Sequence, residues 1–254
     1  MLNTALPRLR RFLAARLSPE GEMGLHVTIG IALLLCAAWA FGAIAEDVVE
    51  GDTITVIDVQ LAHWFHTHAT PGFTRVMLFV THCNGIPGSS IMAALLALWF
   101  WRRRAHYWLI VCLIAVPGGM LLNVALKHVF RRVRPSFDDP LLSLVTYSFP
   151  SGHTAAATVF YGLLACYLVR RTQAWRARAL IVAGAVAMVM LVALSRMYLG
   201  VHYLSDVLAA AAEGAAWLAI CITAVSTLHR RRLARGGTSW SERAHRADAA
   251  GDLS

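Results

Sequence analysis

Eight residues, in three separate stretches of the chain, have side chains that could bind a phosphate group and transfer it. Lysine and arginine donate several hydrogen bonds to an anion, and the planar arginine fork can hold two phosphate oxygens at once. A histidine can attack phosphorus with one ring nitrogen when a carboxylate holds the other. The eight residues are Lys127, Arg134, Ser151, Gly152, His153, Arg196, His202 and Asp206.

The spacing within two of these stretches adds detail. Asp206 follows His202 by four residues, which places both side chains on the same face of a helix. The carboxylate could then bind one ring nitrogen and leave the other free for in-line attack. Residues 150–153 predict the start of a helix, because Ser151 is a good cap and Gly152 lets the backbone approach a ligand closely. Free N–H groups at that helix end would attract an anion.

In this order, the three stretches resemble the signature of the type 2 phosphatidic acid phosphatase family, the membrane lipid phosphatases related to vanadate-dependent haloperoxidases. The resemblance covers the chain from Lys127 to Asp206. It implies a two-step reaction without a metal or any other cofactor. His202 would attack the phosphoryl group to give a phosphohistidine, His153 would protonate the leaving oxygen, and water would then release the phosphate. It also implies that five residues hold the phosphate oxygens: Lys127, Arg134, Ser151, Gly152 and Arg196.

The composition indicates where such a site must lie. Hydrophobic residues make up 58% of the chain, charged residues make up 15%, and the mean hydropathy is +0.58, which excludes an ordinary soluble domain. A helical bilayer crossing needs about 20 predominantly apolar residues. We therefore predict an all-α integral membrane protein, a six-helix bundle. The expected spans are residues 25–45, 85–101, 107–126, 154–169, 180–194 and 203–228.

The basic residues orient this bundle. If six spans alternate in direction, 17 of the 23 lysine and arginine residues fall on one face, which is then cytoplasmic. The same alternation places all three stretches on the other face, so we expect the active site at the outer face of a cytoplasmic-type (inner) membrane. Arg131 and Arg132 border the third span and are typical of interfacial anchors that extend toward water.

We expect one domain, with a segment before it and a tail after it. Residues 1–24 are expected to form a cytoplasmic N-terminal segment, and residues 25–228 the six-span domain, with the motifs in 127–206. The first apolar run is longer than that of a cleaved signal peptide, which favours an uncleaved anchor. Residues 229–254 are polar and without apolar periodicity, which predicts a disordered cytoplasmic tail.

A second group of histidines, His63, His66 and His68, could suggest a metal site. His63 and His66 could share one face of a short helix, but no cysteine or carboxylate stands at a spacing that would complete a ligand set. Trp64 and Phe65 are more typical of an amphipathic segment at the membrane surface. We therefore predict no metal here.

The sequence favours a phosphatase that hydrolyses the phosphate or diphosphate of a membrane lipid. The resemblance implies substrates of the undecaprenyl diphosphate or phosphatidylglycerol phosphate type and does not choose between them. A lipid phosphotransferase remains an alternative, as does a non-catalytic lipid-binding or transport relative. The net charge of +9 does not indicate nucleic acid, because the basic residues flank the spans, where membrane lipids with anionic headgroups are the expected partners. The oligomeric state stays open.

Overall fold

The computed structural model describes residues 25–142 and 144–251, with side chains through Arg230. All regular elements in these ranges are helices, which confirms the all-α prediction. The helices are α2 (Leu25–Glu50), α3 (Thr53–Thr67), α4 (Pro71–Cys83), α5 (Ile86–Arg102), α6 (His106–Phe130), α7 (Gly152–Arg171), α8 (Trp175–Tyr198) and α9 (Leu204–Gly251).

The helices are long and apolar enough for a multi-pass membrane protein. Among the described residues, α2, α6, α7, α8 and residues 204–230 of α9 each pass as a span, and α4 with α5 counts as a sixth if this pair, bent by 51°, is one span. Every segment that the sequence marked as a span therefore lies on a helix. Near the bend, a Cβ on Gly88 would lie 2.1 Å from the carbonyl oxygen of Cys83, so only glycine fits there without a backbone shift.

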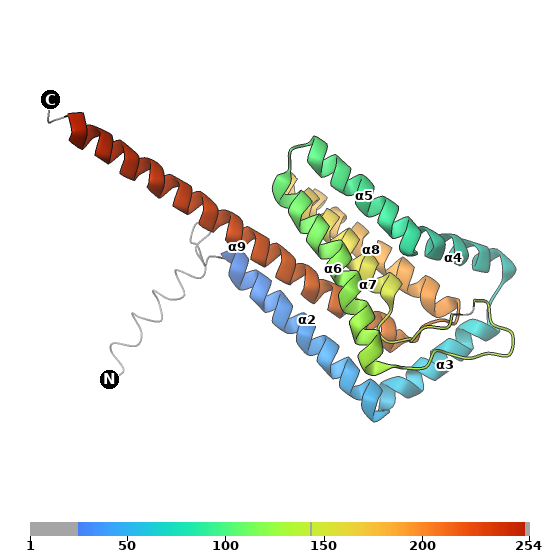
Figure 1. Ribbon diagram of the computed structural model, residues 1–254. Coiled ribbons are helices and arrows are strands. Elements are labelled where there is room, and N and C mark those ends of the chain that lie inside the picture. The colour runs from blue at the N-terminus through green and yellow to red at the C-terminus, as the bar shows by residue number, and fades with distance from the viewer. Residues whose placement is uncertain (1–24, 143, 252–254) are drawn as a thin grey trace, which may run out of the picture.

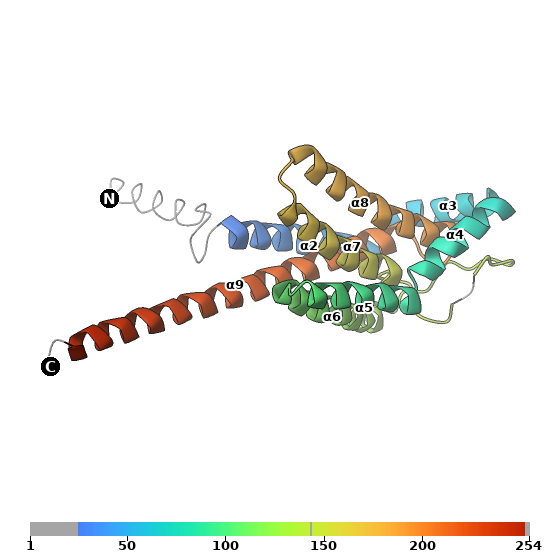
Figure 2. The same cartoon turned by 90° about the horizontal axis from the view of Figure 1, so that it is seen from above.

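Helix α7 lies at the centre of the bundle. It packs against α6, α8 and α9, and 44% of its apolar window is buried, more than in any other candidate span of the described chain. Figures 1 and 2 show α2 beside the first half of α9, with α5 on the opposite flank of the bundle. Several residues from Thr154 to Tyr167 of α7 are therefore buried by neighbouring helices, whereas Arg170 and Arg171 at its end are exposed.

One end of the bundle is closed by aromatic packing. The Phe100 ring is fully buried, and its centroid lies 5.1 Å from that of Tyr167. Trp108 packs edge-on against the same tyrosine at 5.5 Å. Such aromatic pairs each contribute about 0.5–1.5 kcal/mol beyond the area that they bury. This cluster joins α5, α6 and α7 and leaves the other end of α7 for polar residues.

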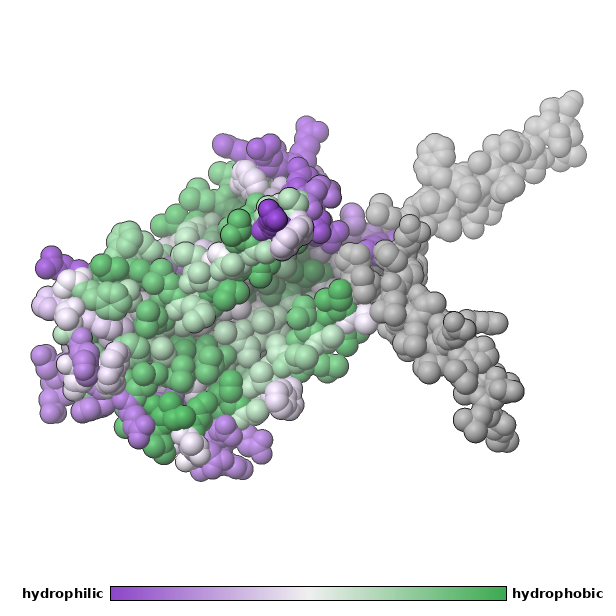
Figure 3. Space-filling view, turned by 180° about the vertical axis from the view of Figure 1, so that it is seen from behind, coloured by the Kyte–Doolittle hydropathy of each residue, from purple (hydrophilic) through white to green (hydrophobic). Residues whose placement is uncertain are grey.

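The outer surface of the bundle is apolar. Figure 3 shows hydrophobic side chains over the middle of one face and hydrophilic side chains at its margins. Large apolar side chains that point outward include Trp39, Leu121, Leu180 and Met190, each more than 60% exposed. A surface of this kind is suited to lipid, because water would make it an aggregation site. The protein is therefore an integral membrane protein with several spans.

The C-terminal prediction differs from the structure. We expected disorder from residue 229, whereas α9 continues as helix to Gly251. The reason is local: this segment is rich in alanine and arginine, which are strong helix formers, and it follows directly on a membrane helix that supplies the nucleus. The expected N-terminal segment, residues 1–24, and residues 252–254 lie outside the described residues.

Candidate active site

The three sequence stretches meet at one end of the bundle. Lys127 lies in the last turn of α6, which ends at Phe130 and is followed by the C-cap Arg131, where the backbone is left-handed with a φ of 49°. Residues 131–151 then lead back to the start of α7. Arg196 lies in the last turn of α8, and His202 follows in the connection to α9.

A pocket of about 610 Å³ opens between these helix ends. Ser151 and Asp206 do not line it, because both are fully buried behind it. The other six residues predicted from the sequence all line the pocket: Lys127, Arg134, Gly152, His153, Arg196 and His202.

His202 lies between a carboxylate and an arginine. Its Nδ1 is 3.3 Å from Oδ2 of Asp206, and its Nε2 is 3.1 Å from Nη1 of Arg134. Because arginine can only donate, Nε2 is assigned as the acceptor nitrogen, and Nδ1–H donates to Asp206. Burial lowers the pKa of His202 to about 3, although the Asp206 carboxylate acts in the opposite direction. At neutral pH Nε2 of this imidazole is therefore unprotonated, and its lone pair accepts the hydrogen bond from Arg134.

The Asp206 carboxylate is fixed from several sides. Its Oδ2 accepts from the Ser148 hydroxyl and from the backbone N–H of Tyr203 at 2.9 Å, in addition to His202. Its Oδ1 accepts from Nη1 of Arg132 at 2.7 Å. Both carboxylate oxygens are thus used, and the side chain that orients the His202 ring has little freedom to rotate.

Two of the cations contact the loop that borders the pocket. Lys127 Nζ donates to the carbonyl oxygens of Tyr147 and Ser148 at 2.7 Å and 3.2 Å. Arg134 donates to the Thr146 carbonyl at 2.6 Å, to the Thr146 hydroxyl at 2.8 Å and to the Tyr147 carbonyl at 3.1 Å. A phosphate group that enters the pocket would compete with these neutral acceptors for charged donors, and it is the stronger acceptor.

Arg196 has hydrogen-bond donors that are not used within the described part of the chain. Its side chain is only 1% exposed, and Nη1 donates to the hydroxyl of Thr81 on α4. Within the described part of the chain, its Nε and Nη2 are buried and have no hydrogen-bond partner. A buried donor without a partner costs about 1–3 kcal/mol, and more when it is charged. An anion in the pocket would satisfy this guanidinium.

His153 lines the pocket from the start of α7. It is the second residue of α7, and its Nε2 lies 3.6 Å from the position that a Cβ on Gly85 would occupy, at the break between α4 and α5. Neither ring nitrogen has a hydrogen-bond partner among the residues that the structure describes. The ring therefore has both nitrogens available for a ligand.

Arg132 corrects one prediction. We expected an interfacial anchor, but its side chain is only 15% exposed and forms ion pairs with Asp206 at 2.7 Å and with Asp58 of α3 at 2.8 Å. Arg132 pairs with these carboxylates and does not extend toward water, because a mostly buried arginine needs hydrogen-bond acceptors that water cannot supply there. Arg131 is exposed, as expected of an anchor.

Asp58 was not predicted from the sequence. It is fully buried, and it also accepts from the backbone N–H of Ser205 at 2.9 Å and from the Ser205 hydroxyl. The only signal in the sequence is a single acidic residue inside the apolar run of 53–62. Its partner, Arg132, is 74 residues away, so no local pattern could pair them.

A second buried carboxylate, Glu213 of α9, was also not predicted. Its Oε2 accepts from the Asn123 amide at 2.9 Å, one turn before Lys127 on α6. The Asn123 oxygen in turn lies 3.0 Å from where a Cβ on Gly152 would be, so a larger residue would push against it. Glu213 and Asn123 thus support the floor of the pocket where α7 begins.

The histidines of α3 take part in ring stacking. His66 stacks on Phe137 with ring centroids 4.1 Å apart, and His68 stacks on Trp64 at 4.6 Å. In the ranges that the structure covers, no three histidine, cysteine or acidic side chains gather as a metal-binding group. The His66 contact packs α3 against the loop that contains Phe137, whereas the His68 contact lies within the end of α3.

Sequence comparisons identify relatives over much of the chain. A model of the PAP2 superfamily matches residues 107–230. Phosphatidylglycerophosphatase B from Bacillus subtilis is 35% identical over 145 residues, which cover 54% of this chain and 68% of the relative. Decaprenylphosphoryl-5-phosphoribose phosphatase from Mycolicibacterium smegmatis is 38% identical over 169 residues, which cover 64% of this chain and 82% of the relative.

Solved structures share the fold. A transmembrane PAP2-type phosphatidylglycerolphosphate phosphatase from Bacillus subtilis superimposes with a TM-score of 0.60 at 28% identity, over 76% of this chain and 93% of that one. LpxE from Aquifex aeolicus gives a TM-score of 0.53 at 21% identity, over 65% and 94%, and supports the fold alone. With two curated relatives above 30% identity, both matched over more than two thirds of their length, the chain belongs to the PAP2 superfamily and is a membrane phosphatase.

Proposed function

We propose that this protein removes a phosphate group from a membrane lipid through a covalent intermediate on His202. In the first step Nε2 of His202 forms a bond to phosphorus, and the bond from phosphorus to the lipid oxygen breaks. His153 donates a proton to that oxygen, so the lipid leaves as an alcohol, or as a monophosphate when the substrate is a diphosphate. Asp206 stabilises the positive charge that develops on the imidazole.

The second step regenerates the protein. His153, now without its proton, accepts one from a water molecule, whose oxygen attacks phosphorus as the bond to Nε2 breaks. Inorganic phosphate leaves, and His202 returns to its neutral form. The same histidine thus acts as an acid in the first step and as a base in the second.

The unsatisfied guanidinium of Arg196 is the observation that carries this proposal. Arg196 lines the pocket together with Lys127 and Arg134, and two of its buried donors have no hydrogen-bond partner among the described residues. Three cations in one pocket match a group with up to two negative charges, and arginine forks on the equatorial oxygens stabilise the charge that spreads in the transition state. Gly152, at the start of α7, would add its backbone N–H to the same group. The N–H of Ser151 already donates to the carbonyl oxygen of Asp206 at 3.0 Å, so Ser151 would act by holding the start of α7 in place.

The pocket favours a lipid over a freely soluble ester. Beside its charged residues it is lined by Ile86, Met120, Val124, Leu144 and Val145, several of which are exposed at the bundle surface. An acyl or prenyl chain could therefore leave the pocket directly into the membrane. The names of the relatives point to phosphatidylglycerol phosphate and to a decaprenyl-linked sugar phosphate, and both substrate types fit this layout.

The positive-inside bias supports an orientation for the site. With the loop that follows α5, the connection between α7 and α8 and the end of α9 on the cytoplasmic side, the pocket opens at the outer face of the inner membrane. A cysteine introduced at Pro140 should then react with a membrane-impermeant reagent on intact cells. One introduced at Arg103 should react only after permeabilisation, and the reverse pattern would place the pocket in the cytoplasm.

The direct test is phosphate release by purified protein from a panel of lipid phosphates and diphosphates with different chains. We expect release that persists in excess EDTA, together with an acid-labile phosphoryl label that maps to His202 after a rapid acid-free quench. Turnover without such a label under single-turnover conditions would argue against the covalent step. Activity that disappears in EDTA and returns with Mg²⁺ would argue against phosphate binding by protein cations alone.

A further inference from the structure

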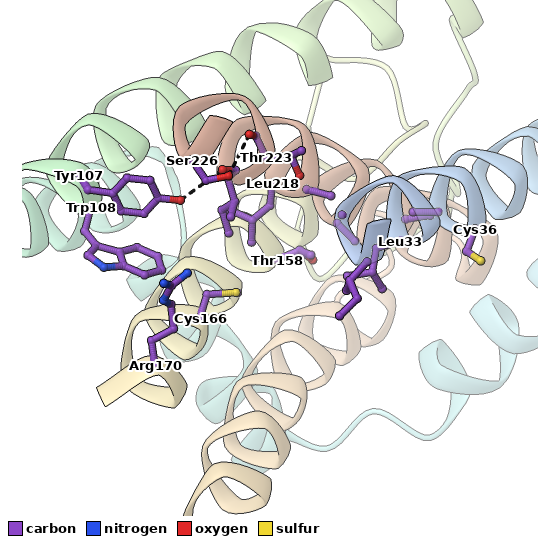
Figure 4. Close-up of a pocket in the computed structure, with 18 of the residues that line it drawn as sticks. Leu33, Cys36, Tyr107, Trp108, Thr158, Cys166, Arg170, Leu218, Thr223 and Ser226 are labelled. Carbon is purple, nitrogen blue, oxygen red and sulfur yellow. Dashed lines mark hydrogen bonds between the residues drawn. The ribbon is translucent and has the colours of Figure 1, made fainter. Parts of the chain in front are cut away.

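A second, larger cavity lies at the other end of the bundle. It has a volume of about 800 Å³ and is formed by α2, α6, α7 and α9 (Figure 4). Arg170 and Arg230 line it where α7 and α9 approach the end opposite the catalytic pocket. None of the eight residues in the proposed chemistry belongs to it.

The walls of the cavity are built from one face of each helix. On α7 the lining residues Thr158, Gly162, Cys166 and Arg170 follow one another every four positions, so three small side chains lead to one cation. A Cβ at Gly162 would lie 2.7 Å from a methyl carbon of Leu218, so a larger residue there would displace that side chain. The small residues on this face of α7 leave room for a groove within the cavity, and the groove ends at the charged side chain of Arg170.

The dimensions fit a single lipid chain. The stretch from Thr158 to Arg170 is about 18 Å long at 1.5 Å per residue. One leaflet of the bilayer core is about 15 Å thick, half of the usual value for the whole core. The groove therefore covers the depth of one leaflet, with Arg170 at the level of the headgroups.

The charge at the rim favours an anionic occupant. Figure 4 shows the Arg170 side chain directed into the cavity, near Cys166 of the same helix. No carboxylate of the described residues forms an ion pair with it. Arg170, Arg230 and Tyr107 all line this cavity, so two cations lie on its wall. Phosphate groups are preferred partners for arginine pairs of this kind.

We propose that this groove binds one anionic glycerophospholipid from the leaflet opposite the catalytic pocket, with an acyl chain along α7 and the phosphate at Arg170 and Arg230. The bound lipid fills the space between α2 and α7 and so completes the packing of the bundle at this end. This lipid site is separate from the catalytic pocket, and the lipid bound there is not hydrolysed.

Native mass spectrometry of protein in a mild nonionic detergent tests this proposal, with phosphatidylglycerol and phosphatidylcholine of identical chains as probes. We expect one phosphatidylglycerol to bind at least tenfold more tightly than phosphatidylcholine. Arg170→Gln should remove most of this preference. Arg171→Gln is the matched control, because its guanidinium faces the Tyr167 ring outside the groove, and it should change nothing.

A groove-filling variant separates the chain from the headgroup. Ala37→Phe should weaken binding of both lipids by a similar factor, since it occupies space and leaves the cations in place. Hydrolysis of a short-chain phosphate ester verifies that each variant is folded. Equal affinity of the two lipids for the wild type, or equal losses in Arg170→Gln and Arg171→Gln, would overturn the proposal. So would displacement of the bound lipid by vanadate, which would place it in the catalytic pocket.

Discussion

The arginines near the two ends of α7 differ in burial. At its first turn Arg196 and Arg132 are nearly buried, and each is surrounded by side chains from helices distant in the sequence. At its last turn Arg170 and Arg171 are exposed, and aromatic rings and apolar walls are their neighbours. A buried arginine needs partners that water cannot supply, so the two unpartnered donors of Arg196 are available for an anion, whereas an arginine at the surface needs only access to water or headgroups. Chemistry can be built at the first end because the positions of its charges are fixed.

The largest effect should come from the nucleophile. His202→Ala removes the atom that bonds to phosphorus, so turnover should fall by about 10⁴-fold or more. His106→Ala is the matched control, since that histidine is exposed at the other end of the bundle, and it should leave turnover unchanged. Residual activity of a few per cent in His202→Ala, measured as phosphate release, would show that another residue attacks phosphorus.

The next effect concerns the unsatisfied guanidinium. Arg196→Ala should raise the barrier by about 3 kcal/mol, roughly a hundredfold in kcat, if its free donors tighten on the transition state. Arg196→Lys should recover only part of this loss, because an ammonium group cannot reproduce the planar fork. Arg171→Ala, the exposed counterpart, should have no effect on kcat. If the two alanine variants behave alike, burial of Arg196 has no bearing on catalysis.

A smaller effect is expected from Asp58, which touches no substrate. Asp58→Asn keeps the volume but removes one of two charges that hold Arg132, and with it part of the restraint on Asp206. We expect the unfolding free energy to fall by about 2 kcal/mol and kcat to fall about tenfold. A double-mutant cycle with Arg132→Gln should show that the two losses are coupled. Asp139→Asn, an exposed acid on the nearby loop, serves as the control, and fully additive losses in the cycle would contradict the coupling.

The smallest effect is the dependence of stability on pH. Because His202 is neutral when folded, with a pKa of about 3 against 6.5 for the unfolded chain, the unfolded state binds the proton more readily as pH falls below 6.5. Stability should therefore decrease as the pH falls from 6.5 toward 3, by on the order of 1 kcal/mol for each pH unit. His202→Gln should remove this part of the dependence. Thermal unfolding in detergent at pH 7 and pH 5.5 measures it, and parallel curves for the two proteins would contradict a neutral buried His202.

The sequence predicted most of what local patterns can encode. The apolar runs marked every span, and spacing within the motifs placed six of eight residues at one pocket. The partner of Arg132 was missed because two charges 74 residues apart leave no periodic signal. The bend between α4 and α5 was missed because composition indicates how long an apolar run is but does not show whether its helix is straight or bent. The helical tail was misassigned because polarity alone does not separate an exposed helix from disorder.

The ion pair between Asp58 and Arg132 limits how far this enzyme can be truncated from its N-terminal side. The family match begins at residue 107, and α3 lies wholly before it. A protein trimmed to residues 107–230 would retain the eight motif residues but would leave Arg132 with one carboxylate in place of two. The part of the chain that holds the catalytic groups in position is therefore larger than the matched segment, and α3 belongs to it together with the central span.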